Sequence, residues 1–300
     1  MILKIFQALI ILVLLVSHAQ ALQKQIPQES DQQISEFSLA GYGERGKKTW
    51  ELFGKSADIF DEVVRLKDIV GNMYGEKENI KLTADKGDFN KVNNSVHLEQ
   101  NVIVTTSSGA KLTTDSLDWD RKGNLISTQD KVNITRDSMI TTALGAQAEP
   151  SLNKVTLEKN VNVQMDTQEG PKEKQASKIV ITCDGQLNID YGKNIATFNK
   201  NVLVDRQDSK IYSDFMDIYF TSGKTAAPKE KEADKSGGLG LSGKIDKIVA
   251  RGNVKIVRGE NVSYSDEAIY TAADKKITLT GRPKLIIEST EDFKNASVGN

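Results

Sequence analysis

Residues 251 to 287 read RGNVKIVRGENVSYSDEAIYTAADKKITLTGRPKLII, and this stretch decides the fold of the chain. Val254 and Ile256 alternate with polar residues, Gly259 marks a turn, and Ser265-Asp266 is expected to open a second strand. Side chains two residues apart on a strand share one face, so each segment has one apolar side. The stretch therefore predicts a pair of β-strands.

The same frame recurs upstream at a nearly constant interval. An asparagine precedes an aspartate by 13 or 14 residues, and the next asparagine or its equivalent follows 16 or 17 residues later. The period of about 29 residues is typical of repeat architectures. We interpret the recurring aspartates as turn and strand-start residues. The pairs are Asn72 and Asp85, Asn101 and Asp115, Asn201 and Asp214, and Asn253 and Asp266, with Asp184 in the same frame.

Two polar insertions interrupt this frame. Residues 166–178 read DTQEGPKEKQASK, and residues 223–243 read GKTAAPKEKEADKSGGLGLSG. Both are rich in charged and small residues, and we expect them to form flexible loops. They leave a β domain at 37–165, β repeats at 179–288 and a polar tail at 289–300.

Short apolar alternations continue from Ile80 to the end of the repeats, every ten to fifteen residues. Strands joined by such short links must be mostly antiparallel neighbours, so we expect a meandering sheet that folds over on itself. The sequence predicts an all-β fold built from repeated antiparallel strand pairs. Burial of each alternating valine contributes roughly 1.5 to 3 kcal/mol.

The N-terminus carries an export signal. Lys4 precedes an apolar run that ends near Val16, and Ala19-Gln20-Ala21 has the small-x-small pattern of a cleavage site. We expect residues 1–21 to be a signal peptide, with an uncleaved N-terminal anchor as the alternative. Residues 22–36 are polar and rich in glutamine, which indicates a linker.

The region from Glu36 to Val70 supports two interpretations. Residues 41–46 (GYGERG) match the GxGxxG pattern of dinucleotide-binding folds, and apolar residues at helical spacing follow. That fold needs further βαβ units, and nothing after Val70 has a helical period. Two strands joined by a turn at Asp61-Glu62 fit the same residues, and we expect this arrangement.

The composition excludes several classes of protein. The chain has 40 basic and 41 acidic residues, so it offers no basic face to nucleic acid. With one cysteine, Cys183, and two histidines, His18 and His97, it has no disulfide framework and no Cys/His zinc site. We expect His97 to face solvent and Cys183 to be a buried, inert thiol. We therefore expect no enzyme, no metal and no cofactor.

The C-terminal strand is predicted to be a sheet edge. Pro283 has no N–H to donate, and such a residue is tolerated only at an edge or at a strand start. An edge presents unpaired backbone groups that another protein's strand can pair with.

At this point the residues resemble a known family, the periplasmic lipopolysaccharide-transport proteins. Residues 37–165, with LTADKGDFNKVNNSVHLEQNVIVTTSSGAKLTTDSLDWD, look like the LptC-type anchor component. Residues 179–288, most plainly VARGNVKIVRGENVSYSDEAIYTAADKKITLTGRP, look like the LptA-type (OstA-like) bridge component. The resemblance covers some four fifths of the chain.

The resemblance implies an elongated, twisted β-jelly roll that is open along one seam and holds lipopolysaccharide acyl chains between its sheets. Such a protein is a periplasmic carrier or bridge, which receives the lipid from an inner-membrane ABC transporter and passes it toward the outer membrane. Its implied partners are lipopolysaccharide, that transporter and other jelly-roll Lpt components, which join by edge-strand pairing. An uncleaved N-terminus would tether it to the inner membrane.

This sequence departs from the family pattern in two ways. Its leader resembles a cleavable signal, whereas the anchor usually keeps a membrane helix, and one chain joins both components.

Eight alternating residues are candidates for the groove that such a carrier needs, and core packing is the alternative for each. They are Val102, Val104, Val161, Val163, Val202, Val204, Val254 and Ile256.

Two other functions remain open. An exported structural or adhesive β-repeat protein would have a closed core with no space for a lipid. An exported carbohydrate-active enzyme would need paired carboxylates in a cleft, and the repeated aspartates occur only once per repeat.

Overall fold

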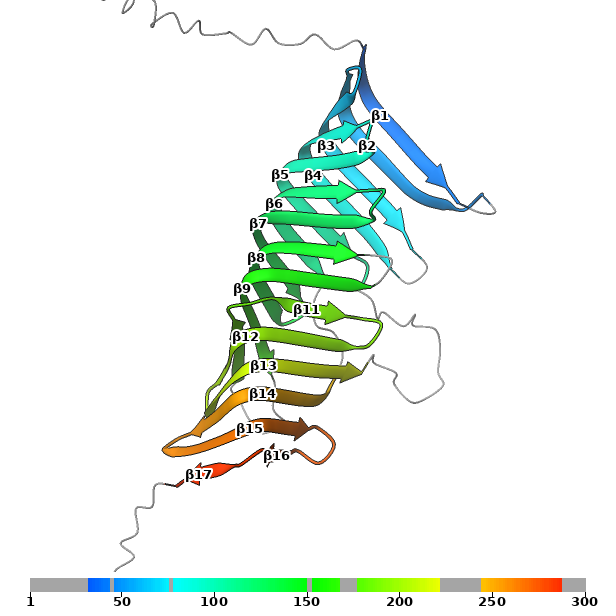
Figure 1. The fold of residues 1–300 in the computed structure, drawn as a ribbon. Coiled ribbons are helices and arrows are strands. Elements are labelled where there is room, and N and C mark those ends of the chain that lie inside the picture. The colour runs from blue at the N-terminus through cyan, green and yellow to red at the C-terminus, as the bar shows by residue number, and fades with distance from the viewer. Residues whose placement is uncertain are drawn as a thin grey trace, which may run out of the picture.

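The computed structural model describes residues 32–43, 46–75, 78–149, 153–167, 177–221 and 244–287. Its regular secondary structure is entirely β and forms an elongated stack of strands (Figure 1). This confirms the predicted all-β, jelly-roll class. The expected signal peptide, the 223–243 insertion and the polar tail lie outside the described residues. In the described part of the chain, no helix is long and apolar enough to cross a membrane.

The strands follow one another in chain order. They are β1 (Gln32–Tyr42), β2 (Lys48–Ile59), β3 (Val63–Tyr74), β4 (Asn79–Asn90), β5 (Ser95–Thr106), β6 (Lys111–Asp120), β7 (Leu125–Arg136), β8 (Met139–Glu149), β9 (Lys154–Thr167), β10 (Ser177–Cys183), β11 (Leu187–Asp190), β12 (Ile195–Arg206), β13 (Ser209–Thr221), β14 (Lys244–Arg258), β15 (Asn261–Thr271), β16 (Lys276–Thr280) and β17 (Lys284–Ile286).

The strands form one antiparallel meander, in which sequence neighbours are hydrogen-bonded neighbours. β10 and β11 act as one interrupted strand, because both pair with β9 on one side and with β12 on the other. In the described residues β1 pairs only with β2, and β16 and β17 pair only with β15. The sheet therefore has an edge at each end, and Pro283 immediately precedes the last edge strand as predicted.

The long strands bend near their middle. The register of β5 shifts between Glu99 and Val102, and that of β12 shifts between Asn199 and Val202. At these shifts the backbone enters the left-handed region, with φ of 52° at both Asn101 and Asn201. Asparagine tolerates this region better than most residues, and bulges bend the strand that contains them. Each bent strand therefore contributes one half to each of two walls.

Hydrogen bonds between neighbouring strands stabilise the bend, each from an asparagine amide to an aspartate carboxylate. The bonded pairs are Asn101 and Asp85, Asn201 and Asp184, and Asn253 and Asp214, with Nδ2–Oδ2 distances of 2.6, 2.8 and 2.8 Å. The interpretation of the five aspartates as turn and strand-start residues is wrong for four of them, and only Asp184 lies in a bend, between β10 and β11. Asp85 and Asp214 lie inside strands, and β15 begins at Asn261 rather than at Ser265. The period of about 29 residues in the sequence arises because every repeat contributes one bend.

Each wall consists of the half-strands that are joined by turns on the same side of the bend. Wall A contains the turns near Ser108, Asp137, Asp208 and Gly259. Wall B contains the turns near Asn93, Lys122, Lys193 and Asp274.

Apolar side chains from both walls fill the interior. One cluster joins Val163 and Ile181 of wall A to Leu157 and Phe198 of wall B, so the walls pack directly on each other. A smaller cluster, around Leu98, lies between β2 and β6. Each buried valine, leucine or phenylalanine contributes roughly 1.5 to 3 kcal/mol, and these clusters hold the folded sheet together.

The strand interpretation of the N-terminal region is confirmed. β2 and β3 meet at the turn that contains Asp61, and the GxGxxG match begins with Gly41 and Tyr42 at the end of β1. No helix follows this match in the described residues, so the dinucleotide-binding arrangement is absent there. β1 begins at Gln32, within the stretch that we interpreted as a linker.

Candidate functional site

Residues that are paired across successive strands form one continuous row on the interior face of wall A, along the whole stack. We call this row lane A. It begins at Leu39 of β1, ends at Leu285 of β17, and is interrupted by only three residues that are not large and apolar: Gly71, Thr141 and Ser263. The other members are Leu52, Leu82, Val104, Leu112, Ile134, Val163, Ile181, Val204, Ile211 and Ile256.

Wall B has a matching row, which we call lane B. It consists of two separate series of residues that are paired across successive strands. The first series includes Ala57, Leu66, Leu98 and Leu117. The second includes Ala146, Leu157, Leu187, Phe198, Met216, Ala250, Ala268 and Leu279. Since the clusters contain members of both lanes, the lanes face each other across the interior.

The interior is closed in the middle of the stack and looser toward β1. Val163 and Phe198 are 0% exposed, whereas Leu52, Leu82 and Val96 are only partly buried. In Figure 1 the β1–β2 hairpin diverges from the strands of the front layer. Fewer interior contacts cost less to break, so the walls separate more easily at the N-terminal end than in the middle of the stack.

The structure places all eight predicted groove residues on the interior face of wall A. Six are buried, and Val104 and Ile256 are partly buried and pack against the larger cluster. The six are Val102, Val161, Val163, Val202, Val204 and Val254, with exposures of 0, 1, 0, 1, 8 and 1%. In this conformation they contact other apolar side chains, and their contact with a lipid stays a prediction.

Sequence reasoning missed the opposing half of the interior. Lane B contains larger side chains than the predicted valines, among them Leu98, Leu157 and Phe198. The signal was present, because these residues alternate with polar ones on their strands. What the sequence did not reveal is that the bend turns them toward the valines.

Both ends of the stack expose apolar side chains next to unpaired strand edges. At the β1 end, Ile34 is 44% and Leu39 is 53% exposed. At the other end, Ile277 is 52%, Leu285 is 60% and Ile287 is 65% exposed. An edge strand with exposed apolar residues favours pairing with a further strand.

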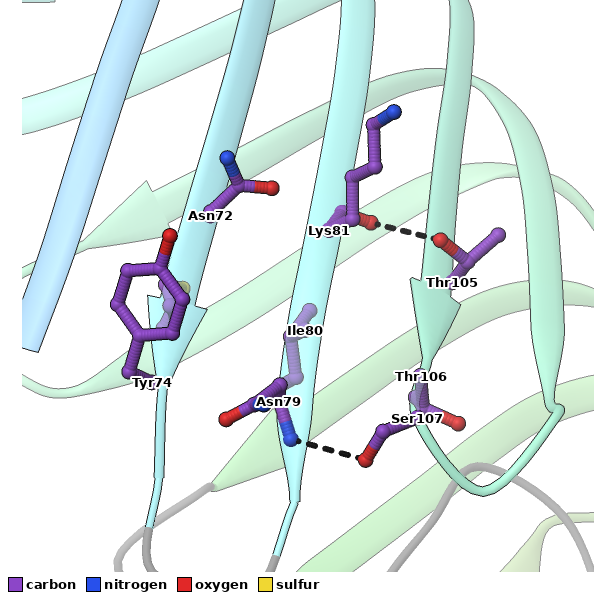
Figure 2. Close-up of a pocket in the computed structure, with 9 residues that line it drawn as sticks. Asn72, Tyr74, Asn79, Ile80, Lys81, Thr105, Thr106 and Ser107 are labelled. Carbon is purple, nitrogen blue, oxygen red and sulfur yellow. Dashed lines mark hydrogen bonds between the residues drawn. The ribbon is translucent and has the colours of Figure 1, made fainter.

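A cavity of about 320 Å³, lined by both polar and apolar side chains, lies at the ends of β3, β4 and β5 (Figure 2). Asn72, Tyr74 and Lys81 line it, together with Thr105 and Ser107. The Thr105 hydroxyl donates to the Lys81 carbonyl, and Ser107 Oγ accepts from the Asn79 amide, so its polar groups already bind one another.

Above this cavity, Glu51 accepts hydrogen bonds from Lys48, Asn72 and Tyr74. The bond from Lys48, followed by that from Tyr74, lowers the pKa of the Glu51 carboxyl. This cluster, in which Glu51, Asn72 and Tyr74 are partly buried, ties β2 to β3.

Among the described residues, His97 lies on the outer face of the sheet and Cys183 lies in the interior. His97 Nδ1 lies 2.7 Å from Asp118 Oδ1 on the outer face, with 45% of its side chain exposed. Cys183 is buried, and desolvation raises the pKa of its thiol to about 11. Within the described residues no group of three or more His, Cys, Asp or Glu side chains could hold a metal ion.

Comparison with protein families gives two matches. Residues 2–166, more than half of the chain, match the family described as "Lipopolysaccharide-assembly, LptC-related". Residues 181–299 match "LptA/(LptD N-terminal domain) LPS transport protein". A search of curated proteins gave no match. The resemblance noted in the sequence is thereby confirmed in both parts and in the expected order. The chain belongs to the LptC-related family of lipopolysaccharide-assembly proteins, and its second part is similar to the LptA/LptD N-terminal transport proteins.

Proposed function

We propose that this chain is a periplasmic carrier that binds lipopolysaccharide acyl chains between walls A and B and passes them from an inner-membrane ABC transporter toward the outer membrane. The role in lipopolysaccharide transport follows from the family. The observation that carries the proposed mechanism is lane A, which runs from β1 to β17 through both matched regions without a charged residue.

A carrier must keep acyl chains out of water. Each buried CH₂ contributes about 0.8 kcal/mol, so a chain of a dozen carbons gains on the order of 10 kcal/mol in an apolar interior. Lane A offers aliphatic side chains at most of its steps, with Leu52, Val104 and Ile134 as examples. Similar neighbouring steps let a chain move with little local cost, and net direction comes from a partner that hydrolyses ATP.

The lipid must part the walls in order to enter. In the middle of the stack an acyl chain displaces contacts within the cluster that contains Val163 and Phe198, and its own burial offsets their loss. The partly buried residues near β1, such as Leu52 and Leu82, are easier to separate. We therefore place the entrance at the β1 end.

Transfer to other components uses the two sheet edges. Within the part of the chain that the structure describes, β1 and β17 each present unpaired backbone groups beside the exposed ends of lane A, Leu39 and Leu285. Another jelly-roll Lpt component that pairs with either edge would extend the sheet and continue the lane. The N-terminal residues would hold the chain at the inner membrane or be removed on export.

A closed structural β-repeat protein is the second candidate, and the tight packing of Val102 and Val161, both 1% exposed or less, favours it.

Photo-crosslinking distinguishes the two functions. A crosslinker at Val104, which faces the interior, should capture lipopolysaccharide in cells. The control position is Glu99 on the outer side of the same strand, where 47% of the side chain is exposed. Capture at Glu99 alone, or no lipid in mass spectra of the purified protein, would support the closed core.

A further inference from the structure

Arg136 is a charged residue on the interior face of wall A. It is the last residue of β7, where buried Val132 and Ile134 alternate with exposed Lys131 and Asn133. Arg136 continues the buried set and is only 7% exposed. Its guanidinium therefore points toward the apolar interior, two residues beyond lane A and next to the turn at Asp137.

The guanidinium has no partner among the residues that the structure describes. Its Nε and Nη1 atoms are buried and form no hydrogen bond. Asp137, the next residue in the chain, is exposed and forms no ion pair with it. Met139, its register partner on β8, is buried and apolar. The site thus holds a positive charge among groups that do not balance it.

An arginine side chain carries its positive charge in folded proteins. A buried charge without a partner is costly, and buried polar groups in folded proteins are almost always satisfied. The guanidinium fork matches two oxygens of a phosphate or carboxylate. The missing partner is therefore an anion that enters from outside the described residues.

We propose that Arg136 is the anion subsite of the lipid-binding interior and binds a phosphate on the sugar that carries the acyl chains. This inference rests on the proposed function. An acyl chain beside Val132 and Ile134 leaves its sugar at the end of wall A, where the strand meets its turn. Lipopolysaccharide carries phosphates on that sugar, so its phosphate is the anion that accompanies the chains to this place. Arg136 thereby sets the depth to which the lipid enters.

The test measures the affinity of the full chain for lipopolysaccharide and for the same lipid after enzymatic removal of its phosphates. Arg136→Met should weaken binding of the phosphorylated lipid by roughly 10- to 100-fold, the range expected for loss of a charged hydrogen-bonded contact. Binding of the dephosphorylated lipid should be unchanged. Arg136→Lys, which keeps the charge but loses the fork, should recover part of the affinity.

The control variant is Arg121→Met, which removes an exposed arginine whose guanidinium lies 5.6 Å from the Trp119 ring. It should leave both affinities unchanged. The melting temperature of lipid-free Arg136→Met should be equal to or higher than that of the unmodified chain, because an unpaired buried charge is removed. A lower melting temperature would mean that Arg136 already has a partner in the free chain, and would overturn the inference.

Three further results would also overturn it. Equal weakening of both lipids by Arg136→Met would show a packing role. Inorganic phosphate that binds as tightly as the lipid would mark a free-anion site. Unchanged affinities with normal lipid capture at Val104 would refute the subsite alone, whereas absence of binding by either lipid would refute the proposed function with it.

Discussion

Phe198 provides the most sensitive test of how the two walls hold together. Its side chain is 0% exposed in lane B, between Leu187 and Met216, which are 1% exposed. Neighbours this tightly packed cannot collapse fully into the space that truncation leaves. Phe198→Ala should therefore lower the free energy of unfolding by about 3 to 5 kcal/mol. With a slope of about 3 kcal/mol per molar urea, the midpoint falls by roughly 1 to 1.7 M.

The assay is urea unfolding followed by circular dichroism, with Phe215→Ala as the matched control. Phe215 lies on the neighbouring strand β13, opposite Arg251, and is 47% exposed. Its truncation should change the free energy of unfolding by about 1 kcal/mol or less, as for most surface substitutions. Equal midpoints for the two variants would refute the assignment of Phe198 to a shared interior between the walls.

Three further predictions concern the bend and the buried thiol. Asn201→Val should destabilise the chain by roughly 2 kcal/mol in the same assay, because it loses the bond to Asp184 and places a β-branched residue at φ of 52°. Asn201→Gly should cost about half as much, and the reverse order would contradict the bend assignment. Gly252→Ala should lower the melting temperature far more than Gly71→Ala, since the added methyl would lie 2.4 Å from a neighbouring aspartate at Gly252 and 3.7 Å from its closest contact at Gly71. Cys183 should resist thiol labelling at pH 8 in the folded chain but not in urea. Since burial raises its pKa from 9.0 to about 11, its contribution to stability is present below pH 9 and is lost as the pH rises through about 11. Rapid labelling of folded protein at pH 8 would contradict this.

The sequence predicted the strands and their order, because alternation and turn residues are local signals. The apolar face of Val102 and Val104 and the edge at Pro283 followed from one strand each. The 29-residue period was also visible, but its cause was not. Asparagine is common both in turns and at left-handed positions inside bulges, so Asn253 alone does not distinguish a strand end from a bend.

Features that depend on several strands could not be predicted. A register shift such as that between Glu99 and Val102 decides which distant residues share a lane. Such a shift cannot be recognised from the alternation of apolar and polar residues along one strand. The burial of Arg136 likewise depends on its neighbours on other strands. Arg136 is the third member of the alternation with Val132 and Ile134, and this pattern indicated that its side chain is buried. An arginine at a strand end is normally exposed to solvent, however.

Crosslinkers placed along lane A test the central claim most directly. The positions are Leu82 near β1, Val163 in the closed middle and Ile256 near the far end, and the controls are their outward neighbours Lys81, Asn162 and Lys255. If acyl chains travel through one continuous interior, lipopolysaccharide should be captured at all three lane positions and at none of the controls. Capture at the controls, or no capture at Val163 despite capture at both ends, would contradict transport between the walls.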